Sequence, residues 1–261
     1  MLSERHDVNA ISHWLTEWIH AGAPVPKEVV CDFSLAILGA LVRSFTPHPD
    51  FKTYLNECFN IMTGNPAAKL PHCYIRVDVA HCIKLICQWE SLRKKAHRVK
   101  DFFVILLPLQ EILQSLEHAR DLLRAIMVVA LSEGEGHDKG LPVTSEGFKT
   151  YLKAQISEET NEIPHEESSP HPDLEHPSDL DTDLKQWVED IYEESQSFAT
   201  SKGDRDDIHF LPDIIPHIKR LASSLPLWSA VLTPTSLVQA SQPVLPQLKW
   251  SSKYKTWAFQ A

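Results

Sequence analysis

Two stretches of this chain, Glu28-Val29-Val30-Cys31-Asp32 and Cys73-Tyr74-Ile75-Arg76-Val77-Asp78, set the architecture that we expect. Each is a short apolar run that ends in an aspartate just before a long helical pattern, which predicts a strand leading into a helix. In α/β folds, the ends of parallel strands and the starts of the following helices face one crevice, where ligands and metals bind. Asp32 and Asp78 are therefore the first candidates for site residues.

Apolar residues recur at helical spacing on either side of these strands. The pattern predicts strands over residues 29–31 and 74–77, and helices over residues 11–21, 34–45, 51–62, 79–95, 102–131 (divided near Pro108), 184–198 and 211–225. The order β-α-α-β-α leaves a connection long enough for a parallel crossover. The predicted fold class is therefore mostly α with a small parallel β component.

The composition changes along the chain and predicts five segments. Residues 156–183 are rich in Pro, His, Glu, Asp and Ser, a composition too polar to offset the entropy of ordering, and we expect an acidic disordered linker there. The predicted division is residues 1–100 with the two strands, 101–155 as a helical insertion, 156–183 as the linker, 184–232 as a helical segment and 233–261 as a disordered tail.

Composition also limits the class of protein. A chain of 261 residues with 43% apolar content can bury a substantial core. No stretch approaches the roughly 18 consecutive apolar residues of a membrane span, and acidic residues near the start do not fit a signal peptide. The five cysteines are odd in number and lie mostly in apolar segments, which favours reduced thiols. We therefore expect an intracellular protein without a membrane partner.

Charge is unevenly distributed along the sequence. Of the 35 acidic residues, 17 lie between positions 158 and 207, where only three residues are basic. The densest basic run lies outside that region, and its cations are Arg93, Lys94, Lys95, Arg98 and Lys100. Such a run can contact phosphates, so these five are the candidate DNA-binding residues. The alternative is a solvated helix end whose cations suit the helix dipole.

The run Glu28-Val29-Val30-Cys31-Asp32-Phe33-Ser34-Leu35-Ala36 resembles the segment around the second catalytic aspartate of Mutator-like transposases, where a strand ending in Asp precedes an Ala- and Leu-rich helix. The run Cys73-Tyr74-Ile75-Arg76-Val77-Asp78-Val79-Ala80-His81 resembles the next element of that family, a strand leading into a helix with a Cys-x-x-His-like pair. Here Asp78 stands where the cysteine is expected. The resemblance implies that residues 1–100 are part of a ribonuclease H-like sheet, interrupted in the family by a helical insertion.

Catalysis in that family requires three carboxylates that hold two magnesium ions. The resemblance matches Asp32 alone. Only one predicted helix precedes Asp32, where the strand with the first carboxylate would lie. The third would fall near residues 235–250, yet residues 233–261 contain no acid. We therefore expect no catalytic residue beyond the remnant position Asp32, no enzymatic activity and no cofactor, with Mg²⁺ bound only if the site proves complete.

Each candidate ligand also has a structural interpretation. Asp32 is either a remnant metal ligand or the N-cap of the helix that begins at Ser34. Asp78 and His81, three residues apart, either share a metal ion or form a structural pair, with Asp78 capping its helix and His81 hydrogen-bonded beneath it. We favour the structural interpretation, which leaves Asp32, Asp78 and His81 as weak metal candidates.

The leading hypothesis is a catalytically incomplete, transposase-derived protein, with the nucleus favoured over the cytoplasm. Its partners would be DNA, bound through the basic run, or a full-length transposase relative or a second copy of itself. The alternative is a helical protein-protein interaction module in which residues 184–198 present an amphipathic helix to a partner. A metal-dependent nuclease is a second alternative, which needs Glu90 or Glu111 to complete a site with Asp32 and Asp78.

Overall fold

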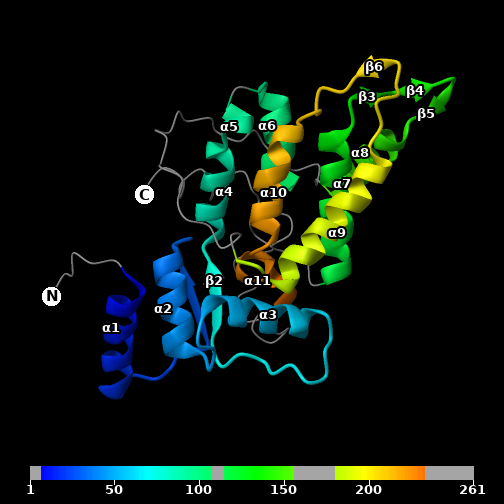
Figure 1. Ribbon diagram of the computed structural model, residues 1–261. Coiled ribbons are helices and arrows are strands. Elements are labelled where there is room, and N and C mark those ends of the chain that lie inside the picture. Colours follow the sequence, from blue (N-terminus) through cyan, green and yellow to red (C-terminus); the bar gives the residue numbers. More distant parts are fainter. Residues whose placement is uncertain (1–6, 94, 107–114, 156–179, 233–261) are drawn as a thin grey trace.

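The computed structural model describes residues 7–93, 95–106, 115–155 and 180–232 (Figure 1). Within these ranges the chain is mostly helical, with short strands in small sheets, which confirms the predicted fold class. The helices are α1 (Val8–His20), α2 (Leu35–Phe45), α3 (Phe51–Met62), α4 (Val79–Gln88), α5 (Glu90–Arg93), α6 (His97–Leu106), α7 (Leu116–Leu131), α8 (Thr144–Gln155), α9 (Asp183–Phe198), α10 (Ile215–Ala222) and α11 (Leu225–Trp228), with 3-10 turns η3 (Pro212–Ile214) and η4 (Ala230–Leu232).

The two predicted strands form a parallel pair. Strand β1 (Glu28–Cys31) lies beside β2 (Tyr74–Val77), with Cys31 opposite Val77, and helices α2 and α3 make the crossover between them. The main-chain N–H of Asp78 donates to the carbonyl of Cys31 at 3.0 Å. Asp32 and Asp78 therefore leave the same end of the sheet, as the sequence predicts.

Side-chain caps determine where several helices begin. The carboxylates of Asp7 and Asp50 accept from main-chain N–H groups at the starts of α1 and α3, at 2.9 and 2.8 Å. The Thr182 hydroxyl does the same for α9 at 3.2 Å. These oxygens satisfy N–H groups that have no partner within the helix. The cap of Asp7 extends α1 three residues before its predicted start at Ile11.

The helix predicted over residues 79–95 is divided. Helix α4 ends at Gln88 and α5 begins at Glu90. Between them the ring of Trp89 stacks on that of His217 in α10, with centroids 5.1 Å apart and planes 18° apart. This tertiary contact, rather than a helix-breaking residue, accompanies the division. The helix predicted over residues 211–225 is also divided, into η3, α10 and the start of α11.

The predicted linker lies mostly outside the described residues, which resume at Leu180. Its final part is ordered, because Thr182 is buried as the cap of α9 and Asp183 is the first residue of that helix. The inward residues Leu184, Val188 and Ile191 are buried in the common core. The hypothesis that residues 184–198 present this apolar face to a partner is therefore wrong. The predicted tail at residues 233–261 lies outside the described residues.

One hydrophobic core joins the described elements. It includes Leu55 of α3, Phe103 of α6, Ile126 of α7, Ile191 of α9 and Ile218 of α10. Helix α9 packs against both α7 and α10 (Figure 1), so late elements of the chain pack against an earlier one. The core continues across the predicted boundaries of the helical insertion and the later helical segment. The division into five segments itself stays a prediction.

Two short antiparallel pairs follow α7 and were not predicted. Strand β3 (Gly134–Glu135) pairs with β6 (Arg205–Asp206), and β4 (His137–Asp138) pairs with β5 (Leu141–Pro142). The turn between β4 and β5 is Lys139-Gly140, with φ of 51° and 82°. Two consecutive positive φ values are typical of a tight hairpin turn, and glycine adopts one of them without strain.

Candidate functional site

Asp32 and His81 meet at the end of the parallel strands. Nδ1 of His81 lies 3.7 Å from Oδ1 of Asp32, whose side chain is 70% exposed. Asp32 does not cap α2, because Ser34 occupies the N-cap position, so the capping interpretation of Asp32 is wrong. The structural interpretation of His81 did not include its pairing with Asp32. His81 is 25% exposed, and a pair at this distance with an exposed carboxylate contributes little to stability.

Asp78 stands directly before α4, and its main-chain carbonyl accepts from the N–H of Cys82 at 3.0 Å. This is the position from which the first bond of a helix is made. Among the described residues, no group of three or more His, Cys, Asp and Glu side chains is arranged to hold a metal ion. Glu90 is exposed at the start of α5, and Glu111 lies outside the described residues.

The predicted DNA-binding residues lie on the turn between two helices. Arg93 ends α5, and Arg98 and Lys100 belong to the first turn of α6. Arg93, Lys95 and Arg98 are exposed, and Lys100 is half-buried. Lys94 lies outside the described residues. We call Arg93, Lys95 and Arg98 the basic turn. The basic turn includes the end of α5 and the start of α6. The interpretation of these cations as the solvated end of one helix therefore accounts for only part of them.

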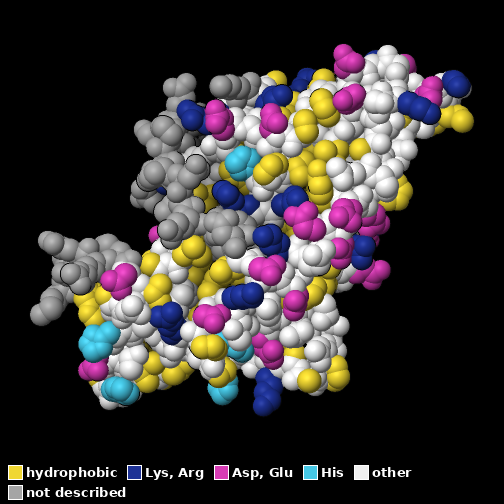
Figure 2. All heavy atoms as spheres, in the orientation of Figure 1, with side chains coloured by type: hydrophobic (Ala, Val, Ile, Leu, Met, Phe, Trp, Pro, Cys, Tyr) yellow, Lys and Arg dark blue, Asp and Glu magenta, His cyan; other side chains and the backbone are white. Residues whose placement is uncertain are grey.

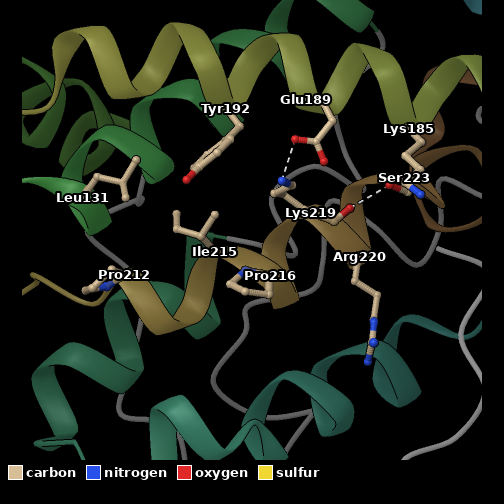
Figure 3. Close-up of a pocket in the computed structure, with 10 residues that line it drawn as sticks. All are labelled: Leu131, Lys185, Glu189, Tyr192, Pro212, Ile215, Pro216, Lys219, Arg220 and Ser223. Carbon is tan, nitrogen blue, oxygen red and sulfur yellow. Dashed lines mark hydrogen bonds and ion pairs between the residues drawn. The ribbon is translucent and has the colours of Figure 1, made fainter. Parts of the chain in front are cut away.

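A groove of about 390 Å³ lies between α9 and α10 (Figure 3). Its two ends differ in character. Figure 3 shows Leu131, Tyr192 and Ile215 near one end and Lys185 and Ser223 near the other, with Glu189 and Lys219 between them. The exposed residues Pro212, Pro216 and Arg220 complete the lining on the α10 side.

The charges in this groove are unequal. Nζ of Lys219 lies 2.6 Å from Oε2 of Glu189 and 4.4 Å from the centroid of the Tyr192 ring. Glu189 is the lone carboxylate among the described lining residues, and this pair neutralises it. Lys185 and Arg220 therefore leave the groove net positive. The Lys219-Arg220 dipeptide was the available sequence signal, but pairing it with α9 requires the tertiary structure.

A second cluster that sequence reasoning missed surrounds Lys149 on the inner face of α8. Its side chain is only 3% exposed, and Nζ lies 2.6 Å from Oε2 of Glu135 and 2.7 Å from Oδ2 of Asp207. Glu146 lies 3.4 Å from the same ammonium. Asp207 also accepts from the main-chain N–H of His209 at 2.9 Å. We call these five residues the Lys149 network.

The pKa values in this network favour the charged forms. Burial alone would lower the pKa of Lys149, but hydrogen bonds and charges from Asp207 and Glu135 raise it above its ordinary value. Burial alone would raise the pKa of Asp207, but hydrogen bonds from His209 and Lys149 lower it. The one feature of the sequence that could have indicated this network is Lys149 itself, a lysine on the inward face of an amphipathic helix. The network joins α8 to β3 and the segment after β6, which is a structural role.

Comparison with known proteins finds a relative encoded by a transposable element. The chain is 32% identical over 236 residues to the 120.7 kDa protein in the NOF-FB transposable element of Drosophila melanogaster. The match covers 89% of this chain. This similarity supports a transposon origin. The chain spans 22% of the length of that protein.

No family model matches the chain, and no solved structure matches it. In the part of the chain that the structure describes, no helix has both the length and the apolar character needed to cross a membrane.

Proposed function

We propose that this chain is a transposase-derived, DNA-binding unit that lacks catalysis of its own. The proposal is carried by one observation: a match that covers 89% of the chain, at 32% identity, to a protein of a transposable element. The resemblance of the Asp32 and Asp78 segments to Mutator-like transposases is consistent with it and suggests a remnant of a ribonuclease H-like sheet. Such a protein would act on DNA, in the nucleus of a eukaryotic cell.

The basic turn is the proposed DNA contact. Arg93, Lys95 and Arg98 are exposed on one short connection, where they can meet successive phosphates without first breaking a buried ion pair. Phosphate contacts of this kind give affinity without sequence preference. The expected activity is therefore salt-sensitive binding to duplex DNA of any sequence.

The test is fluorescence anisotropy with a labelled DNA duplex at several salt concentrations. Replacing Arg93, Lys95 and Arg98 by Gln should weaken binding and lower the salt slope by roughly 0.9 for each phosphate that is no longer neutralised. The matched control replaces three exposed lysines elsewhere, Lys139, Lys153 and Lys202, by Gln, which removes the same charge. Equal losses of affinity in the two triple variants would rule out the basic turn as the DNA-binding surface.

The absence of catalysis is tested on the same protein. With Mg²⁺ and supercoiled plasmid, we expect no nicking by the wild-type chain, and the same result for Asp32→Ala. Asp32, whose exposed carboxylate lies 3.7 Å from the partly buried His81, would then be a remnant position. Magnesium-dependent nicking that disappears in Asp32→Ala would instead assign a catalytic site to the strand ends.

Association with a related polypeptide is a second candidate function, favoured by α1. Trp14 and Trp18 on this helix are 46% and 49% exposed, and no residue of α1 is fully buried. Large exposed aromatic side chains on a peripheral helix are typical of interaction surfaces. Light scattering should detect concentration-dependent self-association that Trp14→Gln removes. A monomer at all concentrations would exclude a second copy of this chain as the partner.

A further inference from the structure

We propose that the groove between α9 and α10 binds an unpaired nucleic-acid strand, one nucleotide of which lies in the groove. This inference rests on the proposed nucleic-acid function, but it concerns a different site and a different form of the ligand from the basic turn. The volume of about 390 Å³ falls within the range of small-ligand sites, roughly 300 to 1,000 Å³.

The two ends of the groove match the two parts of a nucleotide. The half-buried Leu131 and Tyr192, with the buried Ile215 beside them, offer an apolar and aromatic surface to a planar base (Figure 3). Lys185, at the other end, and Arg220, on the α10 side, offer cations to phosphates of the same strand. Proteins that bind single strands combine stacking surfaces with basic grooves in this way.

The central ion pair reduces the repulsion that the Glu189 carboxylate would exert on an anion. Lys219 already neutralises Glu189 at 2.6 Å, and the same ammonium lies over the Tyr192 ring. The arrangement fixes Tyr192 beside the groove before any ligand binds. Such preorganisation lowers the entropy cost of binding.

An unpaired strand fits this groove better than a duplex does. In a duplex the faces of the bases are stacked on one another, so only the phosphates could reach the groove and its apolar end would stay empty. A polyanionic peptide would likewise use only the cations. A preference for single strands therefore distinguishes this site from a general anion site.

One contact joins α10, which forms one wall of the groove, to the segment that precedes the basic turn. Trp89, which joins α4 to α5, stacks on His217 of α10, one helical turn before Arg220. Figure 2 shows lysine and arginine side chains near the middle of this face, with aspartate and glutamate side chains beside them.

The experiment compares a labelled oligothymidylate with a labelled duplex by anisotropy. Lys185→Gln combined with Arg220→Gln should weaken single-strand binding about tenfold and lower its salt slope by roughly 1.4, because each phosphate left without its cation changes the slope by about 0.7. Tyr192→Leu should weaken single-strand binding several-fold without changing the salt slope or the duplex affinity. The matched control combines Lys139→Gln with Lys202→Gln, and urea unfolding verifies that each variant folds.

Each outcome decides between the two sites. If the basic-turn variant loses duplex binding while the groove variants hold oligothymidylate as tightly as the control, this inference is overturned and the proposed function stands. If only the groove variants lose binding, the groove is supported and the basic turn fails. Displacement of oligothymidylate by polyglutamate at equal charge concentration would overturn the preference for nucleotides, as would unchanged single-strand affinity in Tyr192→Leu.

Discussion

The ammonium of Lys149 touches two carboxylates that lie 14 residues before it and 58 residues after it in the chain, Glu135 at 2.6 Å and Asp207 at 2.7 Å. The Asp207 side chain has no exposed surface. A buried ion pair is weak evidence for net stability, because desolvation opposes the attraction. Removing one partner is different, since it leaves the other charge buried without compensation.

Replacing Lys149 by Met should therefore lower the free energy of unfolding by about 3 to 5 kcal/mol. The comparison is Lys153→Met on the same helix, where the side chain is exposed and the change should stay within about 0.5 kcal/mol. Urea unfolding measures both. If the two variants have the same midpoint, Lys149 does not stabilise the buried carboxylates.

The same pair predicts where pH affects stability. The pKa of Asp207 is lowered on folding, so its contribution is present above the unfolded value of 3.8 and is lost as pH falls through the lower folded value. The pKa of Lys149 is raised on folding, so its contribution is present below 10.5 and is lost as pH rises through the higher folded value.

Asp207→Asn removes the part of the pH dependence of stability that Asp207 contributes at acid pH. We expect the variant to be less stable than wild type at neutral pH, and the difference between the two to shrink as pH falls well below 4. Thermal unfolding across the acid range measures this difference. A gap that stays constant down to the lowest pH would mean that Asp207 keeps an ordinary pKa in the folded protein.

At the scale of helices and strands, the N-caps give a test with an internal comparison. The hydroxyl oxygen of Thr182 accepts a hydrogen bond from the start of α9, whereas Ser34 occupies the same position on α2 without a side-chain bond to the helix. Thr182→Ala should cost about 1 kcal/mol of unfolding free energy, and Ser34→Ala much less. Equal costs, measured by urea unfolding, would show that the hydroxyl of Thr182 does not act as a cap.

The sequence predicts a helix or strand well where nearby residues determine its ends. The predicted ranges 51–62 and 74–77 coincide with α3 and β2, because helical spacing of apolar residues marks the helix and a short apolar run marks the strand. The division at Trp89 depends on His217, which is distant in the chain. Strand β3 pairs with β6, which is distant in the chain, and each strand has only two residues, too few to show an alternating pattern in the sequence. The groove could not be predicted from the sequence for the same reason, since its lining residues come from α7, α9, η3 and α10.

At the scale of the whole molecule, the packing of α7 against α9 joins two predicted segments of the chain. These helices belong to different predicted segments, yet they pack together in the common core. Their contact is reinforced at the surface, where Glu194 of α9 accepts from Arg120 at 2.9 Å and from Arg124 at 2.6 Å. Apolar burial supplies most of the stability of such an interface, since partly exposed ion pairs add little.

Cleaving the connection between α8 and α9 should therefore leave the two parts of the chain together. A specific protease site introduced within residues 156–179 would produce an N-terminal piece with α7 and a C-terminal piece with α9, and we expect them to elute as one species in gel filtration. Ile191→Ala, at a fully buried position of α9, should cost about 2 to 5 kcal/mol and promote separation after cleavage. Glu193→Ala on the exposed face of the same helix is the control and should leave the cleaved pieces together. If the cleaved wild-type pieces separate at once, the helical segment after the connection is an independent unit, as the five-segment division implies.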